Sequence, residues 1–307
     1  MKNKTLLLIF LSLLAVFLIT QFAFEKKTRS FKTELIQLDT ASISSILIYP
    51  KSDNQEEMSL KKEGETWILS KGNVTTTANS GSVASLLRNL ALIKTKRVAS
   101  KSQEKWMDYE VEDGNGTRIK VYSGSTLLED FIVGRFNFNQ QTRQGISYVR
   151  LANGDEVYAV DGFLSMTMGQ GFNAYRNNSI SKINKDQVSQ IAINTLGTTE
   201  VIQKAQNGWS LNGTLIDSTQ MANYLTGLQS LNGATFVDDF DELQAQSLLY
   251  KTLSLEGDNM EPVIIKTYRD TSRTEAFVIQ SSQNKDTYFS SDETGIYAKL
   301  FSELKEE

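Results

Sequence analysis

Serine–lysine pairs are the first residues of this sequence whose types and spacing could carry out chemistry. A serine three residues before a lysine can place a nucleophile and a base on one helical turn, as in the penicillin-recognising enzymes. No Ser-Asp-Asn or Lys-Thr-Gly motif follows any such pair, so the spacing does not predict catalysis here. The pairs are Ser59/Lys62, Ser102/Lys105, Ser179/Lys182, Ser282/Lys285 and Ser302/Lys305.

Acidic residues form the second candidate site. Asp238, Asp239, Asp241 and Glu242 offer the oxygen ligands that calcium prefers, but they lack the spacing and central glycine of an EF-hand loop. We therefore predict a solvated acidic loop and no metal site. A carboxylate pair could also hydrolyse glycosides, but a chain with 36 acidic residues does not single out one pair. The pair Gly169/Gly171 lacks the third glycine of a dinucleotide-binding motif and predicts a bend instead.

Composition narrows the choice of function further. The chain of 307 residues contains no histidine and no cysteine, so it lacks the commonest general base, the commonest zinc ligand and any thiolate. Its net charge is −4, and no segment concentrates Lys and Arg among aromatic residues, which argues against binding to nucleic acid. We predict no catalytic, cofactor-binding or metal-binding residues, and hence no enzyme.

The first element along the chain is an uncharged apolar run, Thr5–Phe24. A helix of this length is about 30 Å long, the thickness of a bilayer's hydrocarbon core. We predict a cytoplasmic leader at residues 1–4, a transmembrane helix at 5–24 and a polar tether at 25–42. A cleaved signal peptide is the alternative, but the run is long for one and no Ala-x-Ala site follows it.

The body after the tether consists of two copies of one unit, which we place at residues 43–175 and 176–307. Residues 80–99 and 218–237 align without a gap, and their apolar side chains follow the spacing i, i+3, i+4, i+7 of a helix face. The predicted matches around this helix are Trp67 with Trp209, Tyr122 with Tyr268, Phe131 with Phe277, Tyr148 with Tyr288, and Val157-Tyr158-Ala159 with Ile296-Tyr297-Ala298.

Turn signals give the fold class of each unit. Asn153-Gly154, Asn207-Gly208 and Asn212-Gly213 lie between alternating apolar segments and are typical of β-hairpins. We predict an α+β fold: an N-terminal transmembrane helix, then two tandem, mostly antiparallel β units, each with a packed helix. Further helices are expected from Phe163 to about Tyr175 and near Leu300. Trp67 and Trp209 should pack in the cores, and Leu35, Ile36 and Leu38 of the tether could dock on the body.

Six apolar segments of the first unit carry a resemblance to a known family. They resemble a bacterial family of membrane-anchored proteins that is catalogued as a domain of unknown function. Its members have a duplicated strand-rich body and are often encoded beside ABC transporters of the gliding-motility type, which implies an extracytoplasmic accessory role. No functional residue is carried over, and the role of Arg150 stays open. The segments are Thr66–Leu69, Val83–Leu90, Phe131–Gly134, Ser147–Arg150, Val157–Val160 and Tyr175-Arg176.

These observations predict a non-enzymatic single-pass membrane protein with its body on the extracytoplasmic side. It would act as a scaffold or accessory subunit of an ABC-type transport complex, with the lipid bilayer and transporter subunits as partners. One alternative is a module that binds envelope glycans or peptides, with Trp106, Tyr109, Tyr122 or Tyr175 in a cleft between the units. The other alternative is a hydrolase that uses two carboxylates.

Overall fold

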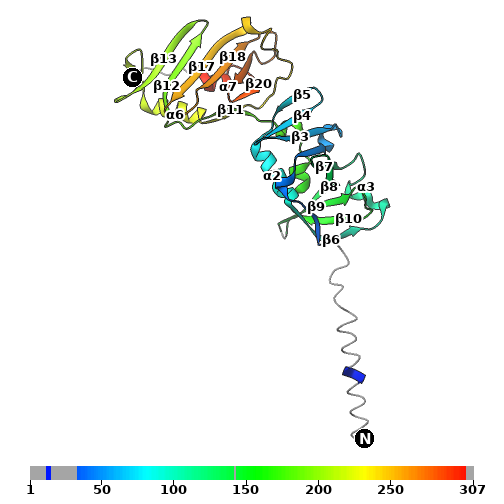
Figure 1. Ribbon diagram of the computed structural model, residues 1–307. Helices are drawn as coiled ribbons and strands as arrows, with labels where there is room; N and C mark the ends of the chain where they lie inside the picture. The colour runs from blue at the N-terminus through cyan, green and yellow to red at the C-terminus, as the bar shows by residue number, and fades with distance from the viewer. Residues whose placement is uncertain (1–11, 15–32, 142, 302–307) are drawn as a thin grey trace.

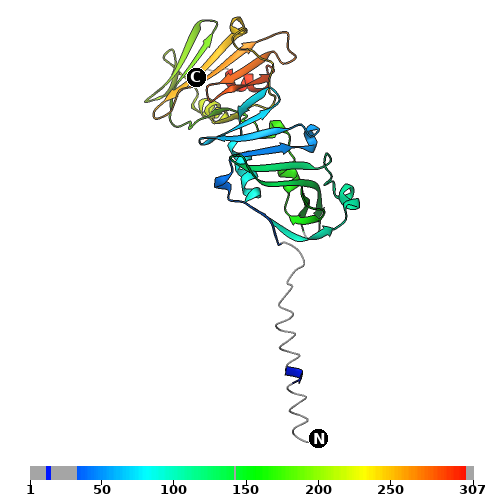
Figure 2. The ribbon, with the colours of Figure 1, turned by 45° about the vertical axis from the view of Figure 1, so that its right-hand side comes forward.

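The computed structural model describes residues 12–14 and 33–301 except residue 142. Within these residues the chain forms two large sheets, one of ten strands and one of eight, and a two-stranded sheet, β11–β16. All neighbouring strands whose pairing is described run antiparallel, from β1–β6 in the first sheet to β19–β20 in the second. Figures 1 and 2 show the two large sheets as separate lobes that lie end to end along the molecule.

The first unit contains strands β1–β10 and the helices packed on them. A long helix, α2 (Ser80–Ala91), follows the fifth strand, and three short helices come later: α3 (Trp106–Tyr109), α4 (Leu164–Met168) and α5 (Phe172–Tyr175). The strands are β1 (Glu34–Gln37), β2 (Ser45–Tyr49), β3 (Met58–Glu63), β4 (Thr66–Lys71), β5 (Val74–Thr77), β6 (Leu92–Ser100), β7 (Thr117–Ser123), β8 (Thr126–Asn139), β9 (Gln144–Leu151) and β10 (Val157–Asp161).

The second unit contains strands β11–β20. Its long helix, α6 (Ser218–Leu228), again follows the fifth strand, and α7 (Ile296–Phe301) follows the last one. The strands are β11 (Ser179–Lys182), β12 (Val188–Thr195), β13 (Thr198–Ala205), β14 (Gly208–Leu211), β15 (Thr214–Leu215), β16 (Ser230–Asn232), β17 (Leu249–Gly257), β18 (Val263–Arg269), β19 (Phe277–Ser281) and β20 (Asn284–Ser291).

The two units share one strand order. The first sheet runs β1-β6-β10-β9-β8-β7-β2-β3-β4-β5. The second runs β20-β19-β18-β17-β12-β13-β14-β15, with β11–β16 beside it and one bridge from Phe236, just after β16, to Phe289 in β20. Each strand of the second unit has neighbours that correspond to those of the strand of the first unit whose number is lower by ten. The body is thus a duplication at the level of topology.

The long helix of each unit begins at an acceptor side chain. The side chain of Asn79 accepts a hydrogen bond from the Ser82 N–H, and that of Asp217 accepts one from Gln220. Ser80 and Ser218 are therefore the first residues of the two helices, each directly after its cap. The apolar stripe packs on the sheet: in α2 it buries Val83, Leu86 and Leu90, and in α6 it buries Met221, Tyr224, Leu225 and Leu228.

After the long helix, the predicted correspondence between strands of the first and second units is wrong by one strand. Tyr122 lies in β7, which pairs with β2, whereas Tyr268 lies in β18, which does not pair with β12. The strand that occupies the place of β7 is β17. Similarly, Val157–Ala159 lies in strand β10 but Ile296–Ala298 lies in helix α7. Successive strands show the same alternation of apolar and polar residues. Sequence spacing alone therefore could not show which strands of the two units correspond.

The predicted transmembrane helix is corrected by the structure. Among the described residues, no helix combines the length and apolar character needed to cross a membrane. Among the described residues the fold is therefore two antiparallel β units with packed helices, and none of these helices is the membrane-spanning helix that we predicted. Residues 5–11 and 15–24 of that prediction, and the leader at 1–4, lie outside the described residues.

The predicted tether at residues 25–42 contains part of the fold. Its residues 34–37 form β1, which pairs with β6, and Leu35 and Ile36 are buried in the core of the first unit. The alternative expectation, that Leu35 and Ile36 dock on the body, is therefore confirmed for these two residues. The helix expected from Phe163 to Tyr175 is split into α4 and α5, with Gly169 and Gly171 between them.

Candidate functional site

The junction between the units is built around one buried arginine. Arg176, 2% exposed, follows α5 and forms a bidentate pair with Asp238, its two terminal nitrogens lying 3.0 and 2.7 Å from the carboxylate oxygens. Its guanidinium lies over the Phe236 ring, 3.8 Å from the ring centre. A planar, always-charged group that stacks and pairs at once holds its surroundings in one geometry. The segment after α5 is thereby attached to the segment after β16.

Edge strands of the two sheets also meet at the junction. The hydroxyl groups of Thr76 in β5 and Thr287 in β20 are 2.9 Å apart, and both side chains are buried. The Asn177 N–H donates to the carbonyl of Thr77 in the first unit. From the second unit, Asn284 Nδ2 donates to the Asn177 carbonyl at 2.8 Å. These contacts fix the linking segment to both sheets.

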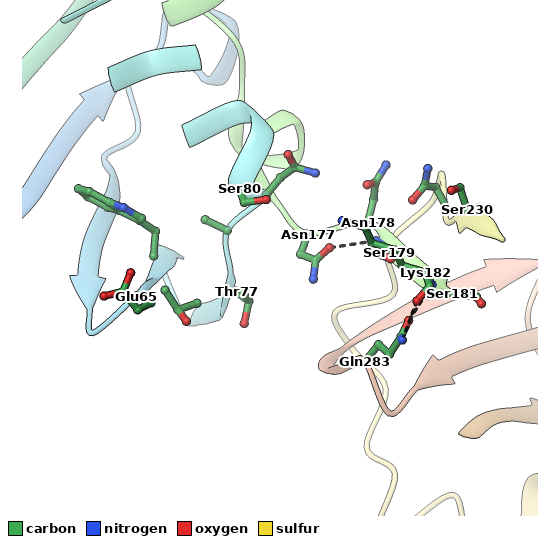
Figure 3. A pocket seen from close by; sticks show the side chains of 15 residues that line it. Glu65, Thr77, Ser80, Asn177, Asn178, Ser179, Ser181, Lys182, Ser230 and Gln283 are labelled. Atoms are coloured by element: carbon green, nitrogen blue, oxygen red, sulfur yellow. Dashed lines mark hydrogen bonds between the residues drawn. The ribbon is translucent and has the colours of Figure 1, made fainter. Parts of the chain in front are cut away.

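A cleft of about 730 Å³ lies beside this junction. Figure 3 shows that its walls come from both units, with Glu65, Thr77 and Ser80 on one side and Ser179, Lys182 and Gln283 on the other. The lining is rich in amide and hydroxyl side chains, with one acidic and one basic residue. Trp67 of β4 also lines it and packs, half-buried, against the core of the first unit. The amide side chains in the lining are Asn79, Asn177, Asn178, Asn232 and Gln283.

The acidic loop is exposed, as predicted, but most of its carboxylates also form ion pairs. Asp238 pairs with Arg176, and Asp239 pairs with Arg273 at 2.9 Å. Glu242 accepts hydrogen bonds from Lys266 at 2.7 Å and Tyr268 at 2.6 Å, and these bonds hold its pKa below the usual value despite partial burial. The loop is thus exposed at Asp238, Asp239 and Asp241, as predicted, and ion pairs of Asp238, Asp239 and Glu242 attach it to the body. Within the described ranges, no group of three His, Cys, Asp or Glu residues could hold a metal.

The other candidate residues are spread over the molecule. Ser179 and Lys182 lie at the two ends of strand β11, so they do not share a helical turn. Tyr175 is buried in the core, and Trp106, Tyr109 and Tyr122 do not line the cleft between the units. Among the described residues, the carboxyl groups whose pKa is shifted all have a pKa below the usual value. These groups are Asp53, Asp239, Glu242, Asp270 and Asp292.

Arg150 has a structural setting that resembles that of Arg176. It is buried, donates through Nε to the Val111 carbonyl at 2.8 Å, and pairs with Asp113 at 2.7 Å. The guanidinium lies 3.8 Å from the centre of the Trp106 ring. It therefore holds the segment between β6 and β7 on the outer face of the first sheet. The sequence analysis named Asp238 but paired neither arginine with its aspartate, because Asp113 and Asp238 lie far from Arg150 and Arg176 along the chain.

Comparison with protein families adds one result to this geometry. Residues 67–249 match the family described as Domain of unknown function (DUF4340). The chain belongs to the DUF4340 family. The DUF4340 match runs from β4 of the first unit to the start of β17 in the second, so it includes Arg150, Arg176 and Asp238 but not Asn284 or Thr287 of the junction. The resemblance expected from the sequence is confirmed as far as this family. No curated protein matches the chain.

Proposed function

We propose that this protein is a non-catalytic accessory subunit whose body serves as a scaffold in an ABC-type transport complex on the extracytoplasmic side. One observation carries the proposal: two β units are joined through buried contacts into one elongated body, as Figures 1 and 2 show. A tandem of like units offers a long surface on which partners can assemble. The proposal includes a gene for this protein that lies beside genes of an ABC transporter, as the resemblance implies.

An exposed aromatic patch supplies a contact surface for a transporter subunit. The patch consists of Phe136, Phe138, Phe163 and Met166, at the end of β8 and the start of α4. Phe138 is 45% exposed, Phe163 46% and Met166 57%. The ring centres of Phe136 and Phe163 are 5.1 Å apart. Clustered apolar groups in water typically mark protein contacts, and aromatic residues and Met are enriched in the cores of such interfaces.

Co-purification tests this proposal directly. The tagged full-length protein would be recovered from membranes of its own host in mild detergent, with and without prior cross-linking, and its partners identified by mass spectrometry. We expect subunits of an ABC transporter, with Phe138→Ser lowering their recovery several-fold. Leu243→Ser is the matched control, because Leu243 is 85% exposed in the second unit, outside the patch. Recovery without any transporter subunit, even after cross-linking, would contradict the proposal.

A further inference from the structure

From the cleft between the units we infer that the protein binds a neutral oligosaccharide there. The cleft of about 730 Å³ is of the size that holds small ligands in other proteins. Its lining has one acid, Glu65, and one base, Lys182, on opposite walls, so it has no excess charge for a nucleic acid or a polyanion. The remaining side chains are mostly amides and hydroxyls, which exchange hydrogen bonds with sugar hydroxyl groups.

Several polar groups of the lining are prepared for a ligand. The Oδ1 atoms of Asn79 and Asn177 accept backbone N–H groups of Ser82 and Ser179, at 3.0 and 3.1 Å, which fixes both amides. Amides held in one orientation are a feature of a preorganised polar site.

Trp67 supplies the apolar surface that sugar recognition needs. Trp67 lines the cleft, is half-buried and packs against the core of the first unit, which holds it in place. An aromatic ring held in this way offers a flat face with a polar N–H at its edge. The C–H face of a pyranose ring can stack on this face while its hydroxyls bind the amides.

An extended peptide fits the cleft less well, because the backbone groups it would need are taken. Gln283 donates to the Lys182 carbonyl at 3.0 Å and accepts from the Lys182 N–H at 2.7 Å, so it occupies the edge of β11. The Thr77 carbonyl, at the end of β5, accepts the N–H of Asn177. A peptide that adds as a strand requires a free edge. The walls therefore favour recognition by side chains, as in sugar binding.

Tryptophan fluorescence tests this inference. The full-length protein carrying Trp106→Phe and Trp209→Phe keeps Trp67 as its remaining tryptophan. It would be titrated with maltohexaose, cellohexaose and N-acetylglucosamine hexamer, and in parallel with an uncharged Gly-Ser peptide. We expect a saturable change in emission with at least one oligosaccharide and none with the peptide. Saturable binding of the peptide alone, or no saturable binding of any oligosaccharide, would overturn the inference.

The duplication provides a matched control. Trp209 has the same place in β14 as Trp67 in β4 and packs against the core of the second unit, but it does not line the cleft. By calorimetry, Trp67→Ala should weaken oligosaccharide binding by about tenfold or more, the loss typical of a Trp anchor, while Trp209→Ala leaves it within about twofold. If Trp67→Ala does not fold, Asn178→Ala and Asn232→Ala should each weaken binding by about threefold or more, as loss of one hydrogen bond does. Equal losses in Trp67→Ala and Trp209→Ala, or none in the Asn variants, would contradict a site in the cleft.

Discussion

Arg150 and Arg176 are buried arginines, each stacked on an aromatic ring and paired with an aspartate. Arg150 fixes a segment within the first unit, whereas Arg176 connects two units. Burying a guanidinium is costly unless its charge is paired, so each arginine depends on its partner. The two arginines therefore allow the strength of a junction contact to be compared with that of an internal one.

Arg176→Ala should lower the free energy of unfolding by about 3 kcal/mol, because it leaves a cavity beside Phe236 and an unpaired Asp238. Urea unfolding followed by circular dichroism would measure the loss. Arg150→Ala is the control: it should cost a similar amount, yet it should not increase cleavage by a nonspecific protease at residues 176–179. Equal cleavage at these residues in both variants would show that Arg176 does not hold the junction.

Glu242 predicts a dependence of stability on pH. Hydrogen bonds from Lys266 and Tyr268 lower its folded pKa from the ordinary value of 4.5, so the folded state favours the charged form. This stabilisation is present above pH 4.5 and is lost as the pH falls through the lowered folded pKa. We expect Glu242→Gln to cost about 1.5–3 kcal/mol at pH 7, the range for hydrogen bonds to a charged group. Urea unfolding of both proteins at pH 7, 5, 4 and 3 should show this difference narrow; a constant difference would contradict the assignment.

At the scale of elements, the close approach of two segments depends on Gly233. It lies just after β16, its N–H donates to the Asn178 carbonyl, and a Cβ there would lie 2.0 Å from the Phe289 ring. Gly227 is the contrasting case, since it lies inside α6 and a Cβ there would meet nothing within 4 Å. One glycine is required by packing and the other is not.

These glycines give opposite predictions for the same substitution. Gly233→Ala should destabilise the protein by about 2 kcal/mol or more, because Phe289 cannot move without disturbing the core. Gly227→Ala should stabilise it by up to about 1 kcal/mol, because alanine is the better helix former. Thermal unfolding of both variants would show opposite shifts of Tm. Shifts of the same sign would mean that the contact with Phe289 is relaxed in solution.

The long helices, the hairpin turns and the repeat itself could be predicted from the sequence. The correspondence between the later strands of the two units could not. Helices α2 and α6 have a distinctive apolar period, whereas neighbouring antiparallel strands share one alternation and are easily interchanged. The candidate site was not predictable in the same way. Thr76 and Thr287 are 211 residues apart, and no spacing rule connects residues at that distance.

At the scale of the whole molecule, the structure predicts that the two units keep one arrangement. The chain has no cysteine, so Thr76→Cys with Thr287→Cys introduces a single pair at the junction, where the native hydroxyls are 2.9 Å apart. We expect oxidation to form a disulfide that closes a long loop and changes mobility on a non-reducing gel. Thr75→Cys with Thr287→Cys is the control, because the neighbouring residue on a strand points to the other face. If both pairs cross-link equally, the units move freely past each other.

The meeting of β5 with the second sheet explains why a duplicated body need not grow into a fibre. An unprotected strand edge is a template for adding another chain. In the first unit this edge is β5, of four residues, and the second unit lies against it. The corresponding edge of the second unit is β15, which has two residues. At β15 a neighbouring molecule would therefore find half the backbone length to pair with that β5 has.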